Sequence, residues 1–138
     1  MTEEKQLLLK DLCARLPYGV KIEITAHNLD YEKDFGRVVI ADVCSIQTAK
    51  DDDGNLFPCV ITCYDKYKTQ GNDVESIKPY LRPMSSMSEE EREYYFVVRG
   101  KVFSGIIEAE TDWLNAHHFD YRGLIEKGLA LEAPEDMY

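Results

Sequence analysis

The stretch RVVIADVCSIQTAKDDDGNLFPCVITCY, residues 37–64, decides the fold. Residues 37–48 and 56–64 are rich in β-branched side chains, which favour strands. Between them lies an acidic segment that contains the pair Asp53-Gly54, and an Asp-Gly pair between two strand-like runs is a strong hairpin signal. The stretch therefore predicts an antiparallel hairpin in the middle of the chain.

The residues before the hairpin predict a further strand and a helix. Apolar and polar side chains alternate over residues 20–26, the pattern of a strand with one buried face. Further upstream, Thr2 is the expected cap of a helix that Pro17 ends. The leucines of this helix repeat at four-residue spacing, so we expect a buried apolar face with Lys10 and Asp11 on the opposite, polar side.

The residues that follow the hairpin predict shorter elements. Residues 64–72 are polar and indicate a connection, and residues 74–81 indicate an edge strand or an irregular turn. Ser88 and Glu91 form a capping box, which predicts the start of a helix. Residues 94–103 are aromatic and β-branched, which favours a strand after one helical turn.

The C-terminal part predicts two short helices that together carry an aromatic face. Thr111 is the expected cap of the first helix, in which Trp113 and His117 are i,i+4 neighbours. Asp120 is the expected cap of the second, which we expect to end at Gly128.

These elements together predict an α+β fold in a single domain over residues 1–138. We expect an N-terminal helix, a bent antiparallel sheet of four or five strands and short C-terminal helices. A small SH3-like or Sm-like barrel is one form that such a sheet can take.

The charge of the chain restricts its partners. Its 26 acidic and 16 basic residues give a formal net charge of −10. Nucleic-acid binders draw most of their affinity from clustered Lys and Arg, so direct nucleic-acid binding is disfavoured. The longest apolar run, residues 94–98, is too short to cross a bilayer, and Glu3 and Glu4 stand where a secretory signal would be basic. We therefore expect a cytoplasmic protein that binds no membrane.

His117, His118 and Asp112 form the most chemically capable cluster. Imidazole and carboxylate groups serve as zinc ligands, or as a general base with the group that orients it. Adjacent helical residues diverge by about 100°, so at most one histidine faces a given site. We expect one ring to pack beside Trp113 and the other to lie at the helix end, which makes these residues weak catalytic candidates.

No motif predicts a cofactor, an activated nucleophile or a metal site. The acidic turn around Gly54 is no calcium loop, because Ala49 and Val60 would stand at positions that need oxygen ligands. In a strand, Cys59 and Cys63 lie about 13 Å apart at a rise of roughly 3.3 Å per residue, too far for one zinc ion. We expect reduced cysteines, as is usual in the cytosol.

Three stretches carry a resemblance: LLKDLCARLPYGV at residues 8–20, IKPYLRPMSSM at residues 77–87 and WLNAHHFDYRGLI at residues 113–125. In them the chain resembles a group of short uncharacterised proteins from gut Bacteroides species and their phages. The resemblance implies no known activity. It implies a bacterial or phage cytoplasmic setting and a small accessory or interaction protein.

The tyrosines point to binding, because partly exposed tyrosine is enriched at protein interfaces. Five lie in or beside polar segments: Tyr64, Tyr67, Tyr80, Tyr94 and Tyr95. With the acidic surface, they favour a non-enzymatic cytoplasmic module that binds protein. Two alternatives stay open: a small metal-assisted or acid/base hydrolase that uses the His117 and His118 region, and an acidic nucleic-acid mimic that blocks a DNA-binding protein. Homo-oligomerisation also stays open.

Overall fold

The structure is a computed structural model that describes residues 2–100 and 107–138. Its elements in chain order are α1 (Glu3–Arg15), η1 (Leu16–Tyr18), β1 (Lys21–Thr25), η2 (Leu29–Asp34), β2 (Val38–Lys50), β3 (Leu56–Tyr64), β4 (Lys68–Asp73), η3 (Val74–Ser76), β5 (Lys78–Leu81), η4 (Met84–Ser86), α2 (Glu89–Gly100), α3 (Ile107–Ala116) and β6 (Leu131–Glu132). The predicted α+β class is confirmed. The chain divides into two compact units, residues 1–80 and 81–138, and the single domain stays a prediction. None of the described helices combines the length and the apolar character needed to cross a membrane.

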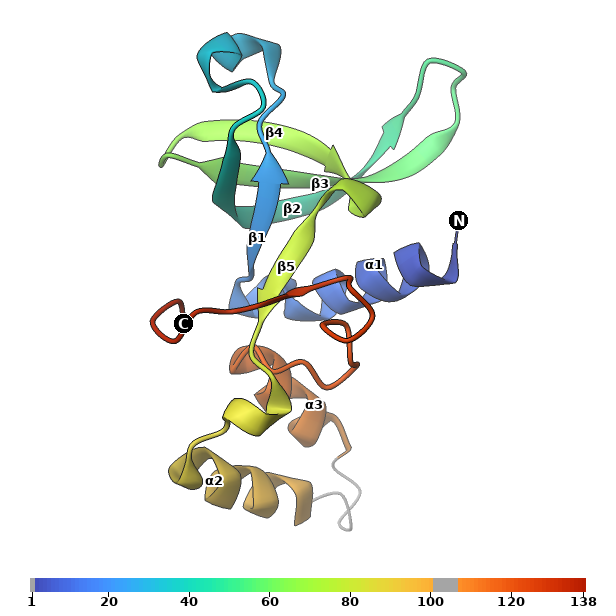
Figure 1. The fold of residues 1–138 in the computed structure, drawn as a ribbon. Coiled ribbons are helices and arrows are strands. Elements are labelled where there is room, and N and C mark those ends of the chain that lie inside the picture. The colour runs from blue at the N-terminus through green and yellow to red at the C-terminus, as the bar shows by residue number, and fades with distance from the viewer. Residues whose placement is uncertain (1, 101–106) are drawn as a thin grey trace. The chain divides into compact units, whose positions relative to one another are not determined.

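Residues 1–80 are built around a sheet whose central feature is the long, curved hairpin of β2 and β3 (Figure 1). Pairing runs from Asp42 opposite Cys63 to Lys50 opposite Leu56, with a bulge near Val43. Gly54 supplies the left-handed φ of +81° at the turn, so the predicted hairpin is confirmed. β1 pairs with β2 and β5, and β4 pairs with β3, all antiparallel.

The sheet is open. The strand order is β4-β3-β2-β1-β5-β6, which has two free ends, so the described strands do not close into the barrel form. The described residues form six strands, more than the expected four or five. The additional strand is β6, next to which the Ala133 N–H donates to the Leu81 carbonyl at 2.8 Å, within residues 81–138.

Polar side chains fill part of the interior of the first unit. The predicted connection over residues 64–72 is wrong, because β4 occupies most of it. Gln70 and Asn72 of β4 are both only 3% exposed. Gln70 Oε1 accepts from the His27 N–H at 2.9 Å, and Asn72 Nδ2 donates to the Val60 carbonyl at 3.0 Å. These hydrogen bonds allow amide side chains to occupy buried positions of a strand.

α1 begins as predicted, since Thr2 Oγ1 accepts from the Lys5 N–H at 3.1 Å. The placement of Asp11 on the polar side is wrong: Asp11 and Arg15 are both fully buried. Arg15 donates two hydrogen bonds to Asp11, at 2.8 and 3.1 Å, one helical turn away. Each charge of the pair therefore has an opposite charge beside it, which a buried ion requires.

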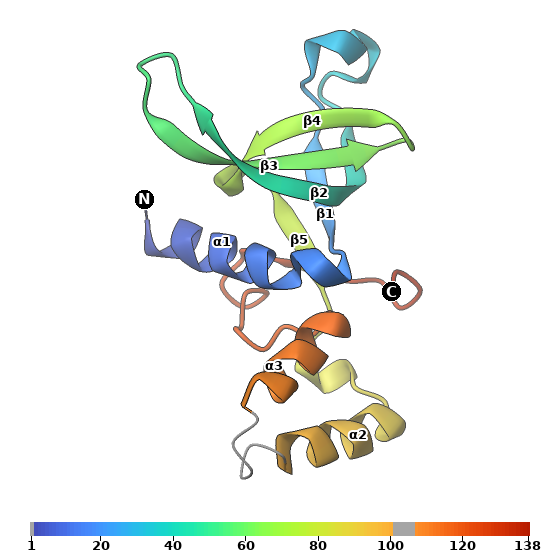
Figure 2. The same cartoon turned by 180° about the vertical axis from the view of Figure 1, so that it is seen from behind.

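In residues 81–138, α2 and α3 lie side by side (Figures 1 and 2). This unit has a core of Met87, Leu114 and Phe119, against which Met84, Tyr95, Trp113 and Tyr121 pack. The capping box is confirmed: the Ser88 N–H donates to Glu91 at 3.0 Å, and the Glu91 N–H donates to Ser88 Oγ at 3.1 Å. The helix then continues to Gly100. The predicted strand is therefore wrong over residues 94–100, and residues 101–103 lie outside the described part.

The prediction of a second C-terminal helix is also wrong, because residues 121–130 form turns and bends. The first helix, α3, begins before Thr111, so Thr111 is not its cap. Asp120 still accepts a backbone hydrogen bond as a cap does, from the Leu124 N–H at 2.8 Å. Gly123 has a left-handed φ of +72°, which does not fit a continuing right-handed helix.

Candidate functional site: an acidic and aromatic pocket

A pocket of about 570 Å³ lies between α2 and α3, within residues 81–138. On α2, residues 90, 93, 94 and 97 are spaced so that they share one helical face. Trp113 lies on α3, and His117 follows the end of this helix, where its N–H donates to the Trp113 carbonyl at 3.0 Å. The side chains that line the pocket are Glu90, Glu91, Glu93, Tyr94, Val97, Trp113 and His117.

The aromatic part of the pocket is centred on Trp113. Its ring lies 4.4 Å from that of His117 and 5.9 Å from that of Tyr94, between centroids. Tyr95 and Phe119 stack on it at 5.6 and 5.7 Å. Because rings contact Trp113 from several elements, its position is fixed before any ligand arrives. Tyr94 remains 56% exposed, so the pocket presents an aromatic surface to solvent.

One acidic residue of the pocket is already paired. Arg82 donates two hydrogen bonds to Glu91, at 2.8 and 2.7 Å. These bonds lower the pKa of Glu91 to about 2, because they favour the charged carboxylate more than its partial burial disfavours it. The hydrogen bond from the Ser88 N–H acts in the same direction. Glu91 therefore stays ionised and its charge is compensated by Arg82.

Glu90 and Glu93 differ from Glu91. Both side chains are exposed. Among residues 2–97 and 110–138, whose side chains the structure describes, neither takes part in an ion pair. The lining of the pocket therefore combines aromatic rings with exposed carboxylates.

The structure gives the two histidines different surroundings. The side chain of His117 is 43% exposed in the pocket, with Nδ1 4.0 Å from a Glu91 oxygen. His118 has a left-handed φ of +65° at the end of α3, and its ring stacks on Tyr138 at 3.6 Å. Asp112 is exposed on α3. In the described part of the chain, no three His, Cys, Asp or Glu side chains form a group that could hold a metal ion, and the hydrolase alternative stays a prediction.

The five tyrosines have different environments. Tyr94 lines the pocket and Tyr95 packs behind it in the aromatic cluster. Tyr67 is 70% exposed and Tyr80 is partly buried. Tyr64 is only 2% exposed, so the expected partial exposure is wrong for this residue.

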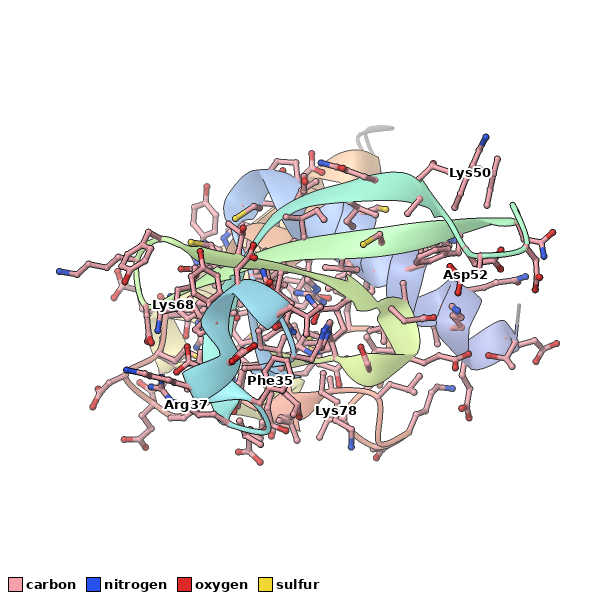
Figure 3. All side chains as sticks on the ribbon, turned by 90° about the horizontal axis from the view of Figure 1, so that it is seen from above. Phe35, Arg37, Lys50, Asp52, Lys68 and Lys78 are labelled. Atoms are coloured by element: carbon pink, nitrogen blue, oxygen red, sulfur yellow. The ribbon has the colours of Figure 1, made fainter. Side chains whose placement is uncertain are left out.

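A second group of charges lies in residues 1–80. Lys68 Nζ is 2.7 Å from an Asp34 oxygen, and Arg37 lies 2.9 Å from Asp65. The hydrogen bond from Lys68 is the main cause of the lowered pKa of Asp34. Figure 3 shows Arg37 and Lys68 at one end of this unit, away from Lys50. Opposite charges compensate each other here, so the cluster braces the surrounding turns and offers little net charge to a ligand.

The sequence contains a signal for the pocket that the strand interpretation concealed. Glu90, Glu93, Tyr94 and Val97 follow the i, i+3, i+4, i+7 spacing of one helical face. Extending the helix predicted by the capping box would have joined them. Their proximity to Trp113 depends on the packing of α2 on α3, which no local pattern indicates.

Comparisons of the chain with protein-family models, with curated proteins and with solved structures found no match. The resemblance to the Bacteroides and phage group therefore stays a prediction.

Proposed function

We propose that this chain is a non-enzymatic protein-interaction module, and that the pocket between α2 and α3 receives a side chain of its partner. The observation that carries the proposal is an open pocket lined by Trp113 and Tyr94. Tyr94 and Val97, on its α2 side, are 56% and 61% exposed. Aromatic side chains are enriched at protein interfaces, and adjacent exposed apolar groups mark sites where water is displaced on binding.

The rigidity of the pocket supports binding. Trp113 is held by neighbouring rings, and the Arg82–Glu91 ion pair fixes the first turn of α2 to the segment before it. Binding to a site that is already ordered loses less conformational entropy than binding to one that must be ordered. The binding of a partner therefore loses less free energy to the ordering of the pocket.

The proposal is tested by affinity capture from a lysate of gut Bacteroides cells, the setting that the sequence resemblance predicts. Three baits are compared: the unchanged chain, the pocket variant Tyr94→Ala/Val97→Ser and the control variant Phe35→Ala/Val38→Ser. The control removes similar side chains from residues 1–80, where Phe35 and Val38 are 49% and 60% exposed.

We expect a partner that the unchanged chain and the control retain and that the pocket variant loses. Circular dichroism of each bait confirms that it is folded. Equal retention by all three baits, or no partner on the unchanged chain, would contradict the proposal.

A further inference from the structure

Residues 81–138 already hold one guanidinium group in a well-defined way. Arg82 donates two hydrogen bonds to the carboxylate of Glu91, at 2.8 and 2.7 Å. Its guanidinium carbon lies 4.1 Å from the centre of the Phe119 ring. A carboxylate thus meets the N–H groups while an aromatic ring covers the face, which is the environment that a planar guanidinium prefers.

The pocket presents the same two kinds of group to solvent. Tyr94 and Trp113 supply aromatic rings, and Glu90 and Glu93 supply exposed carboxylates. Glu91 is not free for a ligand, because Arg82 compensates its charge. In the described part of the chain, no cation is seen paired with Glu90 or Glu93.

Charge around the pocket favours a basic ligand. Residues 81–138 contain 12 acidic and 6 basic residues, a formal net charge of −6. The electrostatic field of this net negative charge attracts basic segments and repels phosphate backbones. The pocket volume of about 570 Å³ leaves room for a long side chain.

Resting on the proposed function, we propose that the side chain received by the pocket is an arginine in a basic segment of the partner. Its guanidinium stacks on the exposed ring of Tyr94, beside Trp113, and donates to the carboxylates of Glu90 and Glu93. Lysine fits less well, because its ammonium is a strongly hydrated point charge with no flat face to stack.

A peptide titration tests this inference. Trp113 is the only tryptophan of the chain, so its fluorescence reports on the pocket without a label. Three Gly/Ser peptides are compared that differ only in carrying three arginines, three lysines or three citrullines. Citrulline keeps the shape of arginine and removes its charge.

We expect saturable binding of the arginine peptide, weaker binding of the lysine peptide by about fivefold or more, and no saturable response to citrulline. The change Glu90→Gln/Glu93→Gln should weaken arginine binding about tenfold, a loss of the size expected when charge-assisted hydrogen bonds are removed. The control Glu89→Gln/Glu126→Gln has the same net charge change at exposed positions outside the pocket, and it should alter binding less than about twofold.

Several results would overturn the inference: absence of saturable arginine binding, equal binding of lysine or citrulline, or equal weakening by both pairs of Glu→Gln changes. The captured partner separates this inference from the proposed function. If binding of the partner depends on Tyr94 and Val97 but not on Glu90 and Glu93, the proposed interaction module is supported and the proposal of an arginine ligand is refuted. A partner indifferent to all four residues refutes both.

Discussion

Arg82 and Glu91 are joined by two hydrogen bonds, of 2.8 and 2.7 Å, which tie the segment after β5 to the first turn of α2. The same carboxylate accepts from the Ser88 N–H at 3.0 Å and so completes the helix cap. One side chain therefore serves both as a cap and as an ion-pair partner. α2 also carries Glu90 and Glu93 of the pocket, so this pair fixes their helix to the segment that precedes it.

The pair predicts a pH-dependent stability. The pKa of Glu91 is lowered from its usual 4.5 to about 2. The stabilisation is therefore complete above about pH 4.5 and is lost as the pH falls toward 2. The full shift corresponds to roughly 3 kcal/mol, and for a carboxylate that is partly exposed we expect about 1 to 2 kcal/mol.

Denaturant unfolding of the unchanged chain and of the Glu91→Gln variant, at several pH values, measures the contribution of the Glu91 charge to stability. We expect the variant to be less stable at pH 7, and the difference between the two free energies of unfolding to shrink as the pH approaches 2. A difference that is the same at pH 7 and pH 2 would show that the charge of Glu91 contributes nothing.

The buried pair of Asp11 and Arg15 in α1 predicts an asymmetry between single and double changes. Asp11→Ala leaves the Arg15 charge buried without this partner and should cost about 3 to 5 kcal/mol. The double change Asp11→Leu/Arg15→Met replaces the pair by apolar groups and should recover most of that loss. Chemical denaturation of both variants measures the effect. A double variant no more stable than Asp11→Ala would argue against this account.

The turn between β3 and β4 contains an exposed Lys66 with a left-handed φ of +74°. Glycine adopts this conformation without the steric cost of a Cβ, so Lys66→Gly should stabilise the chain by up to about 1 kcal/mol. Gly54→Ala is the reverse change at a φ of +81°, and it should destabilise the chain by about 1 kcal/mol. Thermal unfolding of both variants compares them, and a destabilised Lys66→Gly protein would refute the backbone argument.

The parts of the fold that could be predicted from the sequence are those with local signals. Gly54 follows three aspartates between two β-branched runs, and its positive φ makes the hairpin. Ser88 and Glu91 form their capping box within one turn. In both cases the residues that interact lie only a few positions apart.

The parts that could not be predicted depend on partners distant in the sequence. Gln70 has a side chain that is typical of loops. In the structure its side-chain amide forms hydrogen bonds with the backbone of His27 and Thr25, which allow it to be buried in a strand. Tyr94 and Val97 have high strand propensity, yet the helix that begins at the capping box continues through them. Strand preferences are weak, and the neighbouring Tyr95 stacks on Trp113 and so holds α2 against α3.

The candidate site likewise contains one contact that is local in the sequence and one that is distant. The contact between Trp113 and His117 follows from helical spacing and was predicted. The approach of Tyr94 to Trp113 requires α2 and α3 to pack together, which is a property of the folded unit.

The site is tested most directly by an NMR titration of the labelled chain with the arginine peptide and with the captured partner. Trp113 gives the single indole N–H signal of the chain, and the backbone signals of α2 report on Glu90 and Glu93. We predict that the largest shifts occur at the Trp113 indole and at residues 90–97 with both ligands. Shifts confined to residues 1–80, with the Trp113 indole unmoved, would contradict the assignment of the pocket as the binding site.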